Sequence, residues 1–312
     1  MATTTVSIGS NQSIDTETPA SSSGGGPLYV VTFGTTPSGI SVGDIGFMDT
    51  EDAGGGNASD YTFLVTVISG ANITLKYLTD TGGKGDNSPL GLYTGAGSSG
   101  SPTQAPVVFK RAFSTITLFE GMVDDASPTY WGTTDDVVGE CHGDSAFTDS
   151  RVYFDNKQSL ASVKLTVHED DRHDGKAGTA GKVVIRPTAG SGHNNAIIDV
   201  NIDNFIMEWI EIDLGSLDST NTNKAVLFRG TNDDNIIRNN IIHDKGGDPG
   251  GSGPFPIHVV GAGASDDTLS ILNNIVYSII ETSNDNAAAM LLDAWAGTMN
   301  VYNNTIYNVQ SA

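Results

Sequence analysis

Pairs of asparagines recur between short apolar runs in the second half of the chain. The runs are NIIRNNIIHD (235–244), SILNNIVYSI (270–279) and NVYNNTIYNV (300–309). Asn273 follows Asn239, and Asn303 follows Asn273, at nearly the same distance along the chain. Eighteen asparagines fall in residues 194–312 against five in residues 1–193, so the pairs mark a repeat and not a general bias in composition. A nearly fixed period of this size indicates a stack of repeated supersecondary units.

A second apolar run recurs with a similar period, since the runs around Val226, His258 and Met290 are evenly spaced. The runs are short and rich in β-branched residues, which favours strands over the longer helices of helical repeats. The regular leucine framework of leucine-rich repeats is absent. A coil of parallel strands fits the pattern, with successive coils stacked about 4.8 Å apart. We therefore expect an all-β chain whose second part is a solenoid with a period of roughly 30–34 residues.

The asparagines fit the bends of such a coil. Asparagine tolerates unusual backbone angles, and its side chain can hydrogen-bond to the equivalent residue of the next coil. The predicted ladder consists of Asn239, Asn240, Asn273, Asn274, Asn303 and Asn304. The side chains expected to point inward and form columns are Ile237, Ile241, Leu272, Ile275, Val301 and Thr305 or Ile306.

Shifts in composition predict the domain boundaries. We expect an N-terminal strand and flexible linker (1–26, with SSSGGGP at 21–27), a small all-β barrel or sandwich (27–94), a Gly/Ser/Pro linker (95–106), a helix-containing cap (107–136) and the parallel β-helix (137–312). In the small domain, Ser69–Asn72 is expected to form a hairpin turn. In the cap, Ser114 is the expected N-cap of a helix whose apolar face carries Ile116, Phe119 and Val123.

Charge and composition exclude several classes of partner. A net charge of −22 opposes binding to nucleic acid and docking on anionic membranes, both of which need cationic surfaces. The N-terminal residues show no secretory signal, and no apolar run is long enough to span a bilayer. One cysteine, Cys141, gives no internal disulfide framework. We expect a protein that folds in a cytosol and has neither nucleic-acid partners nor membrane insertion.

Two pairs of acidic residues occupy the same bend of successive coils. Asp233 and Asp234 precede Asp266 and Asp267 by one period of the repeat. Carboxylates one coil apart lie about 5 Å from each other, a separation that suits retaining glycosidases and recruits cations such as Ca²⁺. Asp267 stacks on Asp233 if the asparagines set the register, and Asp266 stacks on Asp234 if the preceding strand does. The alternative interpretation is solvated turn residues that splay apart.

Two further segments carry residue types that bind metals. In GECHGD, Glu140, His142 and Asp144 share one face of a predicted strand, while Cys141 points the other way. That face is either a metal site or the polar outer side of a strand with a buried thiol. HEDDRHDG (168–175) has no spacing that places ligands on one face, so we interpret it as a charged turn.

The strand–bend period and the asparagine pairs resemble those of the right-handed parallel β-helix superfamily, which includes pectate lyases and bacteriophage tailspikes. The resemblance covers roughly residues 137–312. Within the superfamily, the repeat pattern is similar to that of phage tailspike or fibre proteins and of metagenomic β-helix proteins. It implies a right-handed β-helix. A pectate lyase combines acidic Ca²⁺ ligands with an arginine base, but Arg229 and Arg238 lie in no recognisable motif of that family. No catalytic residue is therefore assigned.

The expected function is non-enzymatic and structural or adhesive, as in a virion fibre, spike or decoration protein. Such a protein folds in the host cytosol and reaches a virion or extracellular location without a secretory signal. No capping helix follows VYNNTIYNVQSA, so we expect other copies of the chain or further chain to cover the last coil. Expected partners are further copies, other virion proteins and surface glycans. The alternatives are a filament subunit that stacks head to tail, and a polysaccharide lyase or glycoside hydrolase acting on the β-helix flank.

Overall fold

The computed structural model describes residues 2–11, 13–25, 28–48, 61–80, 106–124, 134–188, 196–217, 224–229, 233–245, 254–261, 267–280, 287–293 and 296–310. The chain divides into two units. The antiparallel unit comprises Thr4–Ser114 and Thr129–Trp131, and the parallel unit comprises Met1–Thr3, Thr115–Pro128 and Gly132–Ala312. Strand β1 (Thr3–Ile8) begins at Thr3, the last residue of the first segment of the parallel unit. The chain is predominantly β, as the sequence predicts.

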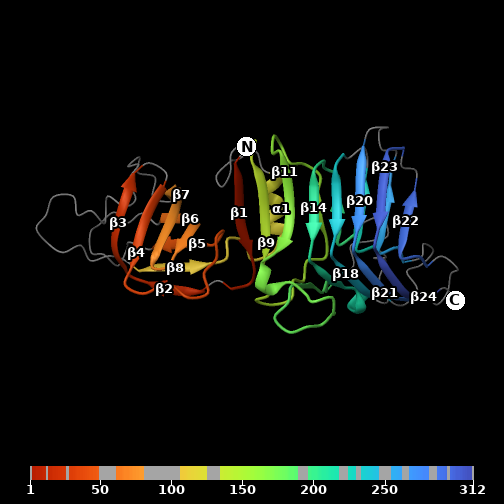
Figure 1. Ribbon diagram of the computed structural model, residues 1–312, viewed down its shortest axis with the longest axis horizontal. Helices are drawn as coiled ribbons and strands as arrows, with labels where there is room; N and C mark the ends of the chain where they lie inside the picture. The colour runs from red at the N-terminus through yellow and green to blue at the C-terminus, as the bar shows by residue number, and fades with distance from the viewer. Residues whose placement is uncertain are drawn as a thin grey trace, which may run out of the picture. The chain divides into compact units, whose positions relative to one another are not determined.

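The antiparallel unit is one sheet in the order β2-β8-β5-β6-β7-β4-β3 (Figure 1). Its strands are β2 (Asp15–Glu17), β3 (Pro19–Gly25), β4 (Leu28–Phe33), β5 (Ile45–Met48), β6 (Tyr61–Ser69), β7 (Asn72–Asp80) and β8 (Val107–Lys110). Ser69 pairs with Asn72 and closes the predicted hairpin. The ring of Phe33 on β4 meets that of Phe109 on β8 at 5.6 Å, although three strands separate β4 from β8 in the sheet. The sheet therefore curves around a shared core.

This sheet extends beyond the expected limits of 27–94. Strands β2 and β3 precede residue 27, and β8 follows residue 94 and pairs with β5 and β2. The prediction of a flexible linker at residues 21–27 is wrong for 21–25, because β3 pairs with β4 along that stretch. Backbone ladder bonds hold a strand of serines and glycines here, whereas the linker prediction rested on side-chain composition alone. The predicted linker at 95–106 lies almost entirely outside the described residues.

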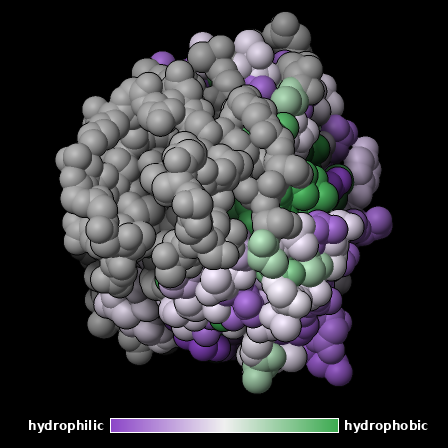
Figure 2. All heavy atoms as spheres, turned by 90° about the vertical axis from the view of Figure 1, so that its left-hand side faces the viewer, coloured by the Kyte–Doolittle hydropathy of each residue, from purple (hydrophilic) through white to green (hydrophobic). Residues whose placement is uncertain are grey.

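Part of the apolar surface of the antiparallel unit is exposed. Leu28 and Val67 have exposed fractions of 49 % and 51 %. Figure 2 shows hydrophobic surface on the face that it displays, with hydrophilic residues along part of its border. Isolated exposed apolar side chains are normal in soluble proteins, so they assign no function to this unit.

Helix α1 (Ile116–Asp124) is the predicted helix, and Ile116, Phe119 and Val123 are its buried residues, as expected. Its N-cap is Thr115, because the Thr115 hydroxyl accepts the N–H of Leu118 at 3.1 Å. The prediction of Ser114 was wrong by one residue, since both are hydroxyl residues that favour this position. Phe119 packs edge-on against Phe154 of β10, so α1 covers the core beside the first strand of one sheet.

The parallel unit contains three parallel sheets (Figure 1). The first sheet contains β9 (Asp136–Cys141), β11 (Ser162–Val167), β14 (Phe205–Glu208), β17 (Asn235–Arg238), β20 (Thr268–Leu272) and β23 (Thr298–Tyr302). The second contains β10 (Val152–Phe154), β13 (Ile198–Val200), β16 (Val226–Arg229), β19 (Ile257–Val260) and β22 (Met290–Asp293). The third contains β12 (Val184–Ile185), β15 (Glu211–Asp213), β18 (Ile241–Lys245), β21 (Ile275–Ile280) and β24 (Thr305–Gln310). Two 3₁₀ helices, η3 (Glu169–Asp171) and η4 (Gly215–Leu217), lie in the connections.

From β11 onward the chain visits the first, third and second sheets in turn, and we call one such passage a coil. The later pairs of the first sheet keep the predicted period: Ile206 with Ile236, Asn235 with Leu269, and Thr268 with Thr298. The earlier pairs depart from it. The offset from Asp136 to Ser162 is shorter, and the offset from Val163 to Phe205 is longer. The longer offset contains a loop from 168 to 183 that the asparagine spacing does not reveal.

The core is built of columns that run from coil to coil. In the first sheet Ile237 pairs with Ile271, and Ile271 pairs with Val301. In the third sheet Ile242 pairs with Val276, and Val276 pairs with Ile306. The expected inward positions of Leu272 and Ile275 were wrong. Ile271 and Val276 are the fully buried residues, whereas Leu272 and Ile275 are only half-buried. Side chains alternate along a strand, so an error of one residue exchanges the two faces.

Candidate functional site

The first asparagine of each pair shapes the bend between the first and third sheets. Asn239, Asn273 and Asn303 have φ values of 58°, 55° and 55°. Asparagine adopts this left-handed region more readily than other residues with a side chain. Trp209, with φ of 66°, holds the equivalent position one coil earlier. The first asparagine therefore sets the direction of the backbone at each bend.

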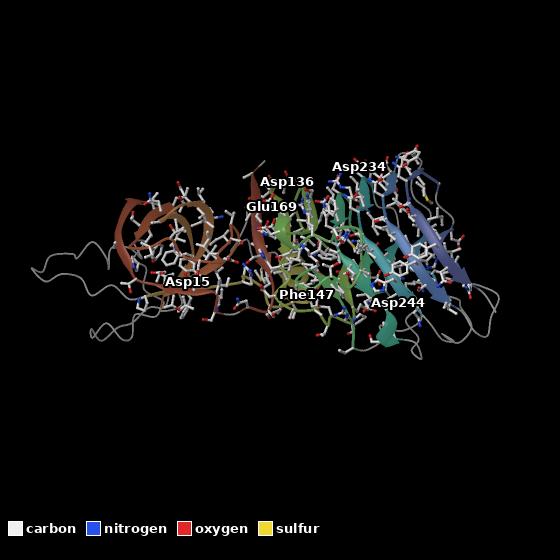
Figure 3. The ribbon with its side chains drawn as sticks, turned by 60° about the horizontal axis from the view of Figure 1, so that its bottom comes forward. Asp15, Asp136, Phe147, Glu169, Asp234 and Asp244 are labelled. Carbon is white, nitrogen blue, oxygen red and sulfur yellow. The ribbon has the colours of Figure 1, made fainter. Side chains whose placement is uncertain are left out.

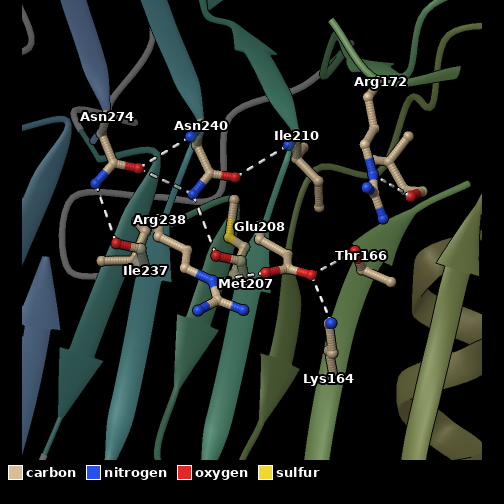
Figure 4. Close-up of polar contacts among 11 residues, drawn as sticks. Lys164, Thr166, Arg172, Met207, Glu208, Ile210, Ile237, Arg238, Asn240 and Asn274 are labelled. Atoms are coloured by element: carbon tan, nitrogen blue, oxygen red, sulfur yellow. Dashed lines mark hydrogen bonds and ion pairs between the residues drawn. The ribbon is translucent and has the colours of Figure 1, made fainter. Parts of the chain in front are cut away.

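The second asparagine links one coil to the next (Figure 4). The side-chain oxygen of Asn274 accepts the backbone N–H of Asn240 at 3.0 Å and its side-chain amide at 3.0 Å, and the Asn274 amide donates to the carbonyl of Ile237 at 3.1 Å. The side-chain oxygen of Asn304 likewise accepts the backbone N–H of Asn274 at 2.9 Å and its side-chain amide at 3.0 Å. Asn240 and Asn274 are fully buried, so these bonds satisfy backbone groups that water does not reach.

The predicted acidic site lies at the bend before the first sheet. The pairing of Asn235 with Leu269 aligns Asp233 with Asp267, one of the two registers that the sequence leaves open. The Asp233 carboxylate accepts the N–H of Thr268 at 2.9 Å and that of Asp234 at 2.8 Å. Asp267 is buried, Asp234 is exposed, and Asp266 lies outside the described residues. Asp233 thus links its own coil to the next one by hydrogen bonds. The Ca²⁺ site expected at these residues stays a prediction.

On the outer face of the first sheet a buried carboxylate joins three coils (Figure 4). Glu208 Oε1 accepts the hydroxyl of Thr166 at 3.0 Å and lies 2.5 Å from Lys164 Nζ. Glu208 Oε2 accepts the Nε–H of Arg238 at 2.6 Å. Burial raises the pKa of Glu208, but the hydrogen bonds from Lys164 and Arg238 outweigh it and lower the pKa overall. Glu208 is therefore a charged cross-link between β11, β14 and β17.

The second sheet has a matching cross-link. Asp199 is fully buried and accepts two hydrogen bonds from Arg229, at 2.7 and 3.0 Å, and one from Arg151 at 3.3 Å. The hydrogen bond to Asp199 raises the pKa of Arg229 further above its ordinary value, despite partial burial. Arg229 and Arg238, the arginines considered above for a lyase base, are thus each held by a buried carboxylate.

The third sheet carries a cluster of ionisable residues that we call the flank cluster: Glu211, Asp213, His243 and Asp244. His243 Nε2 lies 3.1 Å from Glu211, and Asp244 lies 2.9 Å from Nδ1, without the alignment of a hydrogen bond. Glu211 also accepts the N–H of Gly178 at 3.0 Å. Asp213 pairs with Arg186 at 2.8 Å. Figure 3 shows Asp244 and Asp234 on opposite sides of the unit, so the flank cluster is separate from the predicted acidic site.

The electrostatics of the flank cluster favour a positive charge on its histidine. Burial lowers the pKa of His243, but Glu211 and Asp244 raise it by more, so the pKa lies above 6.5. Burial raises the pKa of Asp213, but Arg186 and the N–H of Gly215 lower it by more. Burial and the neighbouring negative charge of Asp244 raise the pKa of Tyr277 to about 12. The cluster therefore favours the charged form of His243 more than water does.

A column of rings extends from the flank cluster to the last coil. The rings of His243 and Tyr277 stack at 5.1 Å with an interplanar angle of 5°, and those of Tyr277 and Tyr307 stack at 4.8 Å and 3°. Strand pairing places all three residues in line with Asp213. Tyr307 is 50 % exposed. The column thus joins a charged centre to an accessible aromatic ring.

The flank cluster was not predicted, although the sequence contains a signal for it. His243, Tyr277 and Tyr307 each lie three residues after the second asparagine of a pair. A ring at one fixed offset in three successive repeats indicates a stacked column, because equivalent positions of a coil lie above one another. The predicted grouping of Glu140, His142 and Asp144 was replaced in the structure by His142 with His168 and Asp171. Among the described residues, this group and Asp213, His243 and Asp244 are the two with metal-ligand proximity.

Comparisons with known proteins add little to this geometry. No family model matches the chain, and no curated protein matches it. Among solved structures, the tailspike gp61 of Pseudomonas phage phi297 is similar at 11 % identity and a TM-score of 0.22, over 97 % of this chain and 56 % of that one. The chain thus spans about half the length of that tailspike. A TM-score this low carries no argument, so the fold described above depends on the strand pairing of this chain. Within the described residues, no helix has the length and apolar character needed to cross a membrane.

Proposed function

We propose that the parallel unit is a right-handed parallel β-helix that serves as a rigid, non-enzymatic structural and adhesive element of the virion fibre, spike or decoration type. The observation that carries the proposal is the use of charged and polar groups to join successive coils. Asp199, Glu208 and Asn274 are buried, and each bonds to residues of a neighbouring coil. Such groups add cohesion along the stack, which is what a rigid rod requires.

The last described coil supports assembly with further copies. The inward columns end there in exposed apolar side chains: Leu292, Val301 and Ile306. Strands β22, β23 and β24 end their sheets, so each has one edge that pairs with no strand among the described residues. Open edges beside apolar surface favour association. At the first strand of the second sheet, α1 covers the core through Phe119, which disfavours the head-to-tail filament. Either another copy or further chain can cover these edges, and for the chain of 312 residues alone we propose an oligomer whose copies meet through their last coils.

The flank of the third sheet supports adhesion to glycans. The exposed ring of Tyr307 offers an apolar face, and Asp244 and Arg186 offer polar partners along the same flank, at 51 % and 47 % side-chain exposure. An aromatic ring with a few polar groups is the usual composition of a small-molecule site. In this proposal the flank binds surface glycans at a virion or extracellular location.

Binding to a glycan panel tests this proposal. We expect the full chain to bind at least one glycan without releasing product, and Tyr307→Ala to weaken the affinity about 10-fold, as loss of one aromatic contact does. The matched control is Tyr302→Ala, since Tyr302 is also accessible but lies on the last strand of the first sheet. Equal weakening by both variants would contradict binding at the third sheet.

A polysaccharide lyase or glycoside hydrolase is the second candidate, and the flank cluster is the observation that favours it. A histidine with a raised pKa among carboxylates can act as a general acid. Product release that Asp213→Asn or Asp244→Asn abolishes would establish this alternative at the flank cluster. Release abolished by Asp234→Asn or Asp267→Asn would instead place it at the acidic bend.

A further inference from the structure

His142, His168 and Asp171 come together from two segments that the sequence separates. Cys141 pairs with Val167 in the first sheet, so His142 and His168 leave neighbouring strands at the same level. Their rings stack at 4.9 Å with an interplanar angle of 25°. Asp171 lies in η3, at the start of the loop 168–183. One ligand atom from each of the three residues lies within 4.8 Å of the other two.

The backbone holds the carboxylate of Asp171 in this position. The N–H of Gly143 donates to Asp171 Oδ2 at 3.1 Å, and the N–H of Val183 donates to the Asp171 carbonyl at 3.3 Å. Gly143 has no side chain, and a β-carbon there would collide with the carbonyl of Gly181. The glycine thus allows both ends of the loop to fold against the end of β9. The arrangement is built into the fold before any ligand arrives.

The imidazole of His142 is poorly satisfied by the protein. Its side chain is 2 % exposed, and Nε2 has no hydrogen-bond partner within the described part of the chain. Nδ1 lies 3.4 Å from Asp171 Oδ2, which is long for a charge-assisted hydrogen bond. The proposed contact therefore depends on Nδ1, the nitrogen that faces Asp171, and an ion bound there would leave Nε2 as it is. No Lys or Arg forms a described ion pair with Asp171.

We propose that His142, His168 and Asp171 bind a divalent transition-metal ion of the Zn²⁺ class. Two imidazoles with one carboxylate suit zinc and its neighbours, whereas Ca²⁺ and Mg²⁺ prefer oxygen ligands alone. Zinc bonds of about 2.0–2.1 Å in a tetrahedron separate ligand atoms by roughly 3.3 Å, close to the 3.4 Å between His142 Nδ1 and Asp171 Oδ2. Water would complete the four ligands.

The ion would fasten the loop 168–183 to the first coils. That loop also carries Gly178, whose N–H holds Glu211 of the flank cluster at 3.0 Å. A metal-fastened loop therefore keeps the flank cluster in place. A ligand that binds the folded state alone also raises the stability of the protein.

The experiment uses the untagged full chain, treated with a chelator and then titrated with Zn²⁺ alone by calorimetry. Co²⁺ serves as a spectroscopic substitute, because a four-coordinate site gives intense visible bands. We expect one ion per chain, a higher melting temperature with Zn²⁺, and affinity about 100-fold lower in Asp171→Asn and in His168→Gln. The asparagine keeps an oxygen that accepts the N–H of Gly143, so this variant retains the loop contact.

Two controls separate this site from others. Asp174→Asn changes an exposed carboxylate of the same loop, whose one described ion pair is with Lys176 at 3.8 Å, and is expected to bind Zn²⁺ as the unchanged chain does. His243→Gln removes the histidine of the flank cluster and is also expected to bind normally. The proposal is overturned if the chain takes up less than one ion, or if Asp171→Asn and His168→Gln bind as Asp174→Asn does. Loss of binding in His243→Gln alone would overturn it by moving the ion to the flank cluster.

Discussion

Asp199 on β13 forms a bidentate ion pair with Arg229 of the next coil, with Nε–Oδ1 and Nη2–Oδ2 distances of 2.7 and 3.0 Å. The Asp199 carboxylate is fully buried. A bidentate pair fixes both the distance and the orientation of two coils. Arg151, which precedes β10, approaches the same carboxylate at 3.3 Å. The contact therefore joins side chains from three successive levels of the stack.

Replacing Arg229 by methionine tests the strength of this contact. The change leaves a buried carboxylate with Arg151 alone, and we expect a loss of about 3 kcal/mol in unfolding free energy, measured by urea denaturation. The matched control is Arg186→Met, because Arg186 pairs with the half-buried Asp213 at a more exposed site. That pair is expected to contribute less than about 1 kcal/mol. Equal losses in the two variants would contradict the special role of Asp199.

Asn274→Ala is expected to destabilise the stack by about 3 kcal/mol. The substitution removes the acceptor for the N–H of Asn240 and the donor to the carbonyl of Ile237, and both groups stay buried. Asn300→Ala is the control, because Asn300 makes one long bond of 3.5 Å to Ser270. We expect a change below about 1 kcal/mol there. Urea denaturation of both variants measures these losses. Similar midpoints for Asn274→Ala and Asn300→Ala would show that the ladder adds no stability.

His243 is expected to make stability depend on pH. Its folded-state pKa is above 6.5, so its contribution is fully present below pH 6.5 and is lost as the pH rises through the folded-state pKa. The destabilisation caused by His243→Gln should therefore be larger at pH 6 than at pH 9. Urea midpoints at the two pH values measure this difference, and an equal effect at both would show that the charge on His243 adds no stability.

His258 provides the opposite case. Burial and the positive charge of Lys224 lower its pKa to about 4, so its neutral form is favoured in the folded protein. Its contribution is present above pH 6.5 and is lost as the pH falls towards 4. His258→Gln should therefore weaken the loss of stability between pH 6.5 and 4.5, which urea midpoints at those pH values measure. A variant that loses as much stability as the unchanged chain would contradict this assignment.

Ile271 and Leu272 are neighbours with opposite roles. Ile271 lies fully buried between Ile237 and Val301, so Ile271→Ala is expected to cost about 3 kcal/mol through the cavity it leaves. Leu272 is half-buried on the other face, and Leu272→Ala should cost less than about 1 kcal/mol. Thermal unfolding of the pair checks the register of the first sheet. A larger effect at Leu272 would show that the register is shifted by one residue.

The sequence predicts the stack because one residue type marks each bend. Asn239, Asn273 and Asn303 adopt a left-handed backbone, and this local requirement is visible in the sequence. The asparagine spacing does not determine which face a neighbour occupies, so it does not distinguish Leu272 from Ile271. The strand at Pro19–Gly25 was missed because its stability comes from pairing with another strand and not from its own serines and glycines.

The candidate sites were harder to predict than the fold. His142 and His168 meet through a strand offset shorter than the later repeats, and the loop 168–183 folds back in a way that no local pattern encodes. The flank cluster depends on the alignment of Asp213 with His243, and that alignment follows only from the paired strands. Chemistry in a coil thus arises from residues that are neighbours across the stack and distant in the chain.

The mass of the purified chain in solution tests the central claim most directly, because a structural element that meets its copies through the last coil must be multimeric. We predict that light scattering at micromolar concentration gives the mass of two or more chains of 32.5 kDa each, and that Val301→Asp combined with Ile306→Asp reduces it to that of a single chain. A stable monomer of 32.5 kDa with its apolar last coil exposed would contradict the account.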